Sequence, residues 1–201
     1  MARDRQHIQI FICNRHGSAY HHDIHRKSGV PVSQTFPKDW FDLPPEKYAD
    51  FGAMFYLAGL TPTHQKRSLA QVLYAFETPL RLGQYHIFRQ NGFPRGFVTF
   101  AGLSREAENR YAIQEQPLKD ADFTSGSSFW IVDLVAPFGQ TKEIVDILKA
   151  EIPHPRVRTN RLVGDMGQNR IVEWTRDTAG EVHMKLYRKK DFKRLLEQGE
   201  G

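Results

Sequence analysis

The run FWIVDLVA at residues 129–136 constrains the fold most, because it is apolar except for one carboxylate and leads into a turn with Pro137 and Gly139. A short apolar run bounded by turn residues is typical of a strand buried in a sheet. Asp133 lies in the middle of this strand, where an unpaired ionised carboxylate would be strongly unfavourable. We therefore expect Asp133 to have a partner, to be protonated, or to lie at an opening in the layer. Each of these indicates a functional site.

Two helices are expected well before this strand. Aromatic and leucine side chains recur at near-helical spacing over residues 45–60, which predicts the first helix. The second is predicted over residues 61–76, with Thr61 as its N-cap and Pro62 at its first helical position. This arrangement places His64 in the first turn of the second helix.

The hydrophobic period then changes to that of strands. The segments 84–90 and 96–102 flank Asn91-Gly92, which is a strong β-hairpin signal. We expect Pro94 to lengthen the hairpin turn by a few residues.

The remaining elements predict an α/β or α+β sandwich. They are a polar helix capped by Ser104, the buried strand, a helix at 141–152, strands at 157–163 and 169–175, and a basic terminal helix. Residues 1–45 are polar, rich in histidine and interrupted by prolines, so we interpret them as a loosely ordered extension preceding one main domain at 46–201.

Composition excludes several classes of protein. With 40% hydrophobic and 25% charged residues, the chain has the composition of a soluble globular protein. Its apolar run at residues 51–60 is about half of the roughly 20 residues that a bilayer requires, so no membrane span is expected. A signal peptide is not evident at the start, and the single cysteine, Cys13, suits a reducing cytoplasm.

The net charge of +5 is compatible with nucleic acid, an anionic membrane surface or an acidic protein as partner. Motifs for nucleic-acid binding are missing, so we do not expect a nucleic-acid partner. Cys13 and the histidines near residues 16–25 could bind zinc chemically, but their spacing matches no usual motif. We predict no metal site.

His64 and Asp133 are the candidate catalytic residues. The helix macrodipole disfavours a positive charge in a first turn, so His64 is expected to be neutral and able to act as a base. Asp133 could accept a hydrogen bond from His64 and orient its ring. The alternatives are that His64 is an ordinary surface residue and that Asp133 pairs with an arginine such as Arg89 or Arg110.

Motifs of several other enzyme classes are absent, among them the nucleophile elbow, the P-loop and the zinc-protease helix. The turn after the buried strand also lacks the glycine-rich run that cradles a pyrophosphate. A nucleotide or coenzyme A cofactor is therefore not predicted.

Four segments carry a resemblance to a known family: TPTH at 61–64, LGQYHIFRQNGFPRGFVTFAGLSREAENRY at 82–111, DFTSG at 122–126 and FWIVDLVAPFG at 129–139. In this order and at these separations they resemble the toxin-activating lysine acyltransferases, the haemolysin-activator family. The resemblance covers about residues 50–190. It departs from the family at tryptophans that are replaced here by Phe55, Leu57, Arg67 and Phe100.

The resemblance implies a GNAT-like fold, with a mixed central sheet flanked by helices, in a cytoplasmic enzyme. Such enzymes take a fatty acyl chain from acyl carrier protein, as a co-substrate rather than a cofactor, and attach it to internal lysines of an RTX protoxin. The essential histidine and aspartate of the family fall on His64 and Asp133, and Thr61 stands where better-known members have serine. Residues 1–45 have no evident counterpart in the family, and a homodimer is left open.

Three alternatives remain at this stage. The first is a covalent acyl-enzyme route. We favour direct attack of the acceptor amine on the thioester instead, because no nucleophile lies in a recognised triad order. The chain could instead be a GNAT-like N-acetyltransferase that uses acetyl-coenzyme A on another amine. The chain could also be a non-catalytic basic binding module. The presence of both His64 and Asp133 disfavours this alternative, because such a module would not require them. Arg81, Arg89 and the stretch 156–161 are the cations expected to meet an acidic carrier.

Overall fold

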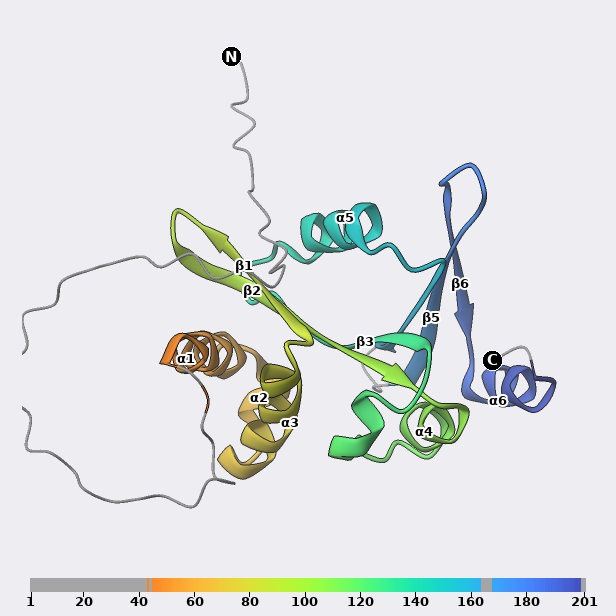
Figure 1. Cartoon of the computed structure of the whole chain (residues 1–201), viewed down its shortest axis with the longest axis horizontal. Helices are drawn as coiled ribbons and strands as arrows, with labels where there is room; N and C mark the ends of the chain where they lie inside the picture. The colour runs from red at the N-terminus through yellow and green to blue at the C-terminus, as the bar shows by residue number, and fades with distance from the viewer. Residues whose placement is uncertain (1–42, 44, 164–167, 200–201) are drawn as a thin grey trace, which may run out of the picture.

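The computed structural model describes residues 43, 45–163 and 168–199 (Figure 1). The predicted extension, residues 1–45, falls almost entirely outside this part of the chain, as do Cys13 and the histidines around it. The prediction of a loosely ordered extension is therefore not addressed.

A single mixed sheet of six strands organises the described residues, in the spatial order β1-β2-β3-β4-β5-β6. Neighbouring strands are antiparallel except for β3 and β4, which are parallel. The strands are β1 (Tyr85–Gln90), β2 (Phe93–Leu103), β3 (Ser128–Val135), β4 (Arg156–Val163), β5 (Gln168–Arg176) and β6 (Val182–Tyr187). The predicted α/β architecture with a mixed central sheet is confirmed.

Helices cover both faces of the sheet, with α5 on one face and the others on the opposite face (Figure 1). The helices are α1 (Pro45–Gly59), α2 (Pro62–Gln65), α3 (Leu69–Leu82), α4 (Arg105–Glu108), the π-helix η1 (Asn109–Ile113), the 3₁₀ helix η2 (Asp120–Phe123), α5 (Thr141–Glu151) and α6 (Lys189–Glu197). The chain therefore forms a layered sandwich with a core on each side of the sheet.

The prediction of one helix over residues 61–76 was wrong, because the segment forms two helices. α2 ends at Gln65, and Ser68 then starts α3 with a capping box. The Ser68 hydroxyl accepts from the backbone N–H of Gln71 at 3.3 Å, and the Gln71 side chain accepts from the Ser68 N–H at 2.8 Å. These reciprocal bonds satisfy two backbone donors and fix a new helix start. Thr61 occupies the N-cap position of α2, but its side chain bonds no backbone N–H there.

The hairpin between β1 and β2 forms as predicted, with Asn91 at φ 52° and Gly92 at φ 80°. Positive φ at both central residues is what the tight type I′ turn requires. Pro94 does not lengthen this turn. It pairs with Arg89 instead. The register shifts beyond that pair, so the irregularity lies within the pairing of β1 and β2 and not in the turn.

Strand β6 was not predicted, although Val182, Met184 and Leu186 alternate with polar residues in the period of a strand. It pairs antiparallel with β5 and forms one edge of the sheet. Met184 and Leu186 are about half exposed, at 56% and 48%, so the alternation does not mark a buried face here.

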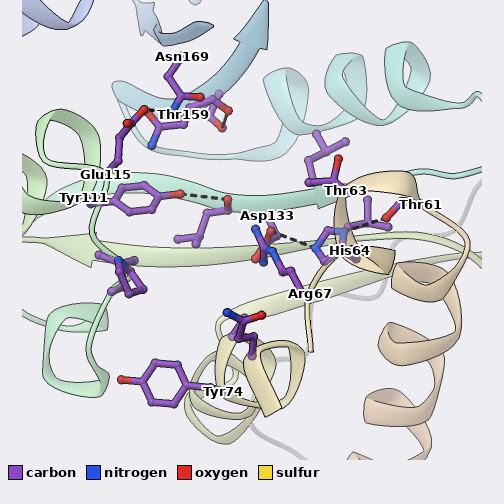
Figure 2. Close-up of a pocket in the computed structure, with 18 of the residues that line it drawn as sticks. Thr61, Thr63, His64, Arg67, Tyr74, Tyr111, Glu115, Asp133, Thr159 and Asn169 are labelled. Atoms are coloured by element: carbon purple, nitrogen blue, oxygen red, sulfur yellow. Dashed lines mark hydrogen bonds and ion pairs between the residues drawn. The ribbon is translucent and has the colours of Figure 1, made fainter. Parts of the chain in front are cut away.

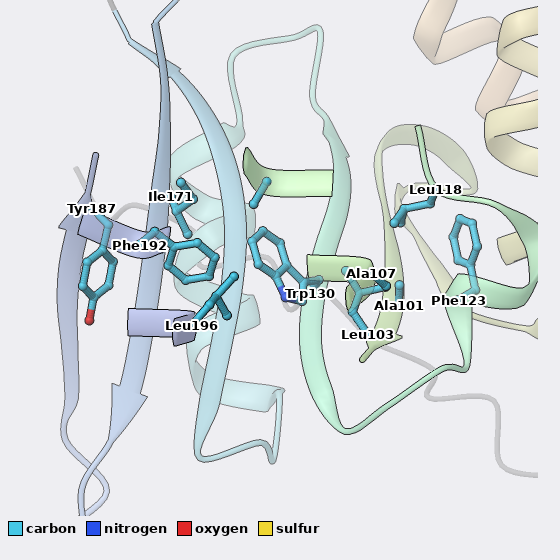
Figure 3. Packing of buried hydrophobic residues seen from close by; sticks show 11 residues of the cluster. Ala101, Leu103, Ala107, Leu118, Phe123, Trp130, Ile171, Tyr187, Phe192 and Leu196 are labelled. Atoms are coloured by element: carbon cyan, nitrogen blue, oxygen red, sulfur yellow. The ribbon is translucent and has the colours of Figure 1, made fainter. Parts of the chain in front are cut away.

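The core on the α6 side centres on Trp130 of β3, which is fully buried (Figure 3). Its ring meets that of Phe192 edge-on, with centroids 5.9 Å apart, and meets Tyr111 in the same way at 5.5 Å. On the opposite face, Ile144 and Leu148 of α5 pack in a cluster with buried side chains from β1 to β5. These two cores hold β3 in place on both of its faces.

A buried charge network lies beside Trp130. Arg158 on β4 is fully buried and contacts Glu108 at 2.6 Å and Glu173 at 2.7 Å. Glu108 also accepts from the indole N–H of Trp130 at 2.7 Å, and Glu173 accepts from the hydroxyl of Tyr187 at 3.0 Å. Arg158 therefore links α4, β4 and β5 in the interior. The prediction that the stretch 156–161 meets an acidic carrier was wrong for Arg158, because its side chain is buried.

Candidate active site

An opening in the sheet lies where β3 and β4 diverge. The two strands pair only from Phe129 and Val157 to Ile131 and Thr159, and each continues beyond this point without pairing to the other. A cavity of about 1060 Å³ lies there, with walls from both strands, α2, α3 and the segment after η1. An opening in the layer, one of the three explanations for a carboxylate in a buried strand, is thus present beside Asp133.

A β-bulge in β3 precedes Asp133. Asp133 pairs with Thr99 of β2, and Ile131 pairs with the next residue, Phe100, so Val132 is an extra residue in β3. The Thr99 hydroxyl accepts from the backbone N–H of Asp133 at 3.1 Å. Bulges of this kind change the direction in which the following side chains point.

The bulge moves Asp133 to the other face of the sheet. In an unbroken strand Asp133 would share the face of Ile131, which packs toward α5. After the bulge, it is Leu134 that packs toward α5, and Val135 packs in the cluster of α1 and α3. Asp133 therefore shares the face of Val135, and its side chain meets His64 from α2.

His64 and Asp133 meet in this cavity (Figure 2). The imidazole Nε2 lies 3.5 Å from the Asp133 Oδ1, and the two side chains are 7% and 15% exposed. His64 also packs against Phe76 of α3, with ring centroids 5.8 Å apart. The interpretation of His64 as a solvated surface residue was wrong, because the ring is buried.

Neither arginine considered as an alternative partner reaches Asp133. Arg89 pairs with Asp50 at 2.8 Å, and Arg110 pairs with Asp122 at 2.5 Å. The described partner of the Asp133 carboxylate is therefore His64.

Thr61 holds the other nitrogen of the ring. Its hydroxyl donates to the Ala58 carbonyl at 2.9 Å, and the same oxygen lies 2.8 Å from the His64 Nδ1. We assign the single hydroxyl proton to the bond with Ala58, so that Thr61 accepts from Nδ1–H. Nε2 is then the ring nitrogen that can take up a proton. It faces Asp133 and makes no hydrogen bond within the described residues.

The contact with Thr61, and not a helix dipole, holds the ring in its orientation. A four-residue helix such as α2 has too few aligned peptide groups for a substantial macrodipole. The sequence had suggested Asp133 as the residue that orients the ring.

Tyr111 is a residue of this cavity that sequence reasoning did not single out. It lies on the π-helix η1, and its hydroxyl donates to the Val132 carbonyl at 3.2 Å (Figure 2). Burial raises the pKa of Tyr111 above its ordinary value, and the negative charge of Asp133 raises it further. Its hydroxyl therefore stays protonated and available as a donor. π-Helical turns often occur at functional sites, but the sequence of this segment predicts an ordinary helix.

The cavity has two chemically different arms. One arm is polar and contains Glu115, Thr159, Asn160, Arg161 and Asn169. The other lies between α3 and residues 117–123 and is largely apolar. Both arms combine segments far apart in the chain, which explains why local sequence patterns did not predict them.

Two of the surface cations expected to meet a carrier are paired within the chain. Arg81 lies 3.8 Å from Glu77 and 3.7 Å from Asp120, and Arg89 pairs with Asp50. Arg161 lies in the cavity wall. Along the segments that the structure covers, no group of three or more histidine, cysteine or carboxylate side chains could hold a metal ion. Those segments also contain no helix with the length and hydrophobicity to cross a bilayer.

Comparison with known proteins places this geometry in context. Residues 44–175 match the RTX toxin acyltransferase family. The leukotoxin-activating lysine-acyltransferase LtxC of Aggregatibacter actinomycetemcomitans is 28% identical over 132 residues, which is 64% of this chain and 79% of that protein. The RTX-I toxin-activating lysine-acyltransferase ApxIC of Actinobacillus pleuropneumoniae is 28% identical over 135 residues, or 67% of this chain and 77% of that protein.

A third relative has a more specific name. The protein-lysine myristoyltransferase RtxC of Kingella kingae is 30% identical over 100 residues, covering 48% of this chain and 58% of that protein. Among solved structures, a Staphylococcus aureus protein provisionally titled an acetyltransferase aligns at 14% identity with a TM-score of 0.36, over 56% of this chain and 74% of that one. A structural similarity at that level supports no conclusion about the fold or function of this chain.

Proposed function

Because the chain belongs to the RTX toxin acyltransferase family, we propose that it transfers a fatty acyl group from acyl carrier protein to the ε-amine of internal lysines in an RTX protoxin. The observation that carries this proposal is the contact of His64 and Asp133, with Nε2 3.5 Å from Oδ1 in a cavity that opens between two strands. The relatives named as lysine acyltransferases support the reaction class. The carrier, the protoxin and a cytoplasmic location are parts of the proposal.

Deprotonation of the acceptor is the first task of such an enzyme. A free lysine with a pKa of about 10.4 is neutral in only about one of 2,500 molecules at pH 7, which corresponds to roughly 4.6 kcal/mol. His64 accepts this proton at Nε2, since its Nδ1–H is held by Thr61. The resulting imidazolium faces the Asp133 carboxylate, which stabilises its charge.

The neutral amine then attacks the thioester carbonyl. A C–N bond forms and the C–S bond breaks. The sulfur leaves on the carrier and takes the proton from the His64 Nε2, while the second ammonium proton passes to solvent. This direct route requires no covalent acyl-enzyme. Intact-mass analysis of enzyme quenched during turnover tests that point, because an acyl increment on the enzyme would indicate the covalent route.

The role of His64 is tested by single-turnover acyl transfer from a loaded carrier to a lysine-containing protoxin segment. His64→Ala should slow the transfer by about 10²–10⁴-fold, the usual contribution of a positioned base. His183→Ala is the matched control, because His183 lies on β6 with its side chain 66% exposed and pairs only with Asp177 among the described residues. A His64→Ala variant with a near-normal rate would show that His64 is not the base.

An N-acetyltransferase that uses acetyl-coenzyme A is the second candidate from the sequence. Titration of the enzyme with coenzyme A in a calorimeter separates the two, because the proposed function requires the carrier and predicts no binding of the free coenzyme in the micromolar range.

A further inference from the structure

We infer that the apolar arm of the cavity holds the hydrocarbon chain of the acyl donor, and that Ala75 limits the length of chain that it accepts. This inference rests on the proposed function and assigns the part of the cavity that selects the donor. We define this arm, the acyl slot, by the residues Ala70, Tyr74 and Ala75 on α3 and Pro117, Leu118 and Phe123 on the facing segment. Gln71 and Gln116 line the cavity next to these residues.

The acyl slot is continuous with the catalytic pair but leads away from the polar arm. Figure 2 shows Tyr74 on the opposite side of Asp133 from Thr159 and Asn169, with Arg67 next to His64. A ligand whose thioester lies at His64 can therefore extend in one of two directions, and only one of them is apolar.

The walls of the acyl slot suit a hydrocarbon. None of its six residues is charged. Leu118 and Phe123 are only 7% and 4% exposed, whereas Ala70, Tyr74 and Pro117 are exposed. Each methylene that moves from water into such an environment contributes about 0.8 kcal/mol. The polar arm, with Glu115, Asn160 and Arg161, would leave charged and polar groups without water if it took the chain instead.

Two hydrogen bonds join the two sides of the acyl slot beyond Ala75. The Thr78 hydroxyl on α3 donates to the Asp120 carboxylate at 2.6 Å, and the Gln84 side chain donates to the Phe123 carbonyl at 3.1 Å. From Ala70 to Thr78, α3 rises about 12 Å, so the slot has a defined length. It is a groove that ends at these contacts.

Ala75 lies in the wall of this groove, less than one helical turn before the Thr78 contact. Its methyl group leaves space that a larger side chain would occupy. Leucine at this position would shorten the slot. Leu118→Ala would remove a side chain from the facing wall and enlarge the slot.

The test uses the full-length enzyme and acyl carrier protein loaded with octanoyl, myristoyl or palmitoyl groups. Single-turnover rates are measured for the wild type, Ala75→Leu and Leu118→Ala. Ala75→Leu should lower the myristoyl and palmitoyl rates at least tenfold relative to the octanoyl rate, and Leu118→Ala should shift the preference toward palmitoyl. Ala150→Leu, the same change at an exposed position of α5, is the matched control and should leave all ratios unchanged.

The outcomes separate this inference from the proposed function. If the wild type transfers none of the three groups, the proposed function fails. If it transfers them and the ratios in both slot variants equal those of the wild type, the function stands and the inference is wrong. A uniform loss for all donors in folded Ala75→Leu, judged by circular dichroism, also contradicts the inference. If Ala75→Leu does not fold, the ratios of the three donor rates are measured for the milder Ala75→Val and for Leu118→Ala, and the same criteria are applied to them.

Discussion

A single extra residue, Val132, determines where the Asp133 carboxylate points. Without it, strand alternation would direct Asp133 toward α5 and away from His64. The buried charge itself could be recognised from the sequence, because an apolar strand rarely contains a carboxylate without a partner. The bulge that selects its partner could not, since it depends on the register with β2.

The contact between Thr61 and His64 gives a prediction at the residue scale. Thr61→Val removes the acceptor of Nδ1–H and frees the ring to change tautomer or rotate. The loss of one hydrogen bond, worth about 0.5–1.5 kcal/mol, should lower kcat roughly two- to twelvefold with little change in KM.

Thr61→Ser retains the hydroxyl and serves as the matched variant. It should restore the rate to near that of the wild type in the same single-turnover measurement. If Thr61→Ser were as slow as Thr61→Val, the hydroxyl would not be the group that matters.

Individual elements differ in how well their local sequence predicts them. The hairpin turn and α5 were predicted because Asn91-Gly92 and the stripe of Ile144 and Leu148 are local signals. The break between α2 and α3 was missed because the capping box of Ser68 and Gln71 lies within a continuous helical pattern. That break separates the helix carrying His64 from the helix that forms the wall of the acyl slot.

The buried network of Arg158 provides the prediction at the element scale. Arg158→Met would leave Glu108 and Glu173 without their cation in the interior. Removing one partner of a buried ion pair is expected to lower the free energy of unfolding by about 3–5 kcal/mol.

Urea denaturation measures this effect, with Arg161→Met as the control on the same strand. Arg161 is exposed in the wall of the cavity and should change the stability by less than about 0.5 kcal/mol. Equal effects of the two substitutions would contradict a structural role for Arg158.

At the scale of the whole molecule, the divergence of β3 and β4 creates the site. It exposes the middle of a strand that is otherwise covered on both faces, and α2, α3 and η1 then surround the opening. The sequence predicted the sandwich and the two residues that meet in it. It did not predict Tyr111 or the acyl slot, because their neighbours come from distant segments.

The central claim is that this chain attaches a fatty acyl group to lysine and that His64 is required. The most direct test is intact-mass spectrometry of an RTX protoxin co-expressed with the wild type or with His64→Ala, followed by peptide mapping. The proposed function predicts a fatty acyl mass increment on internal lysines with the wild type and none, or a strongly reduced fraction, with His64→Ala. An unmodified protoxin with the wild type, or equal modification with both enzymes, would contradict it.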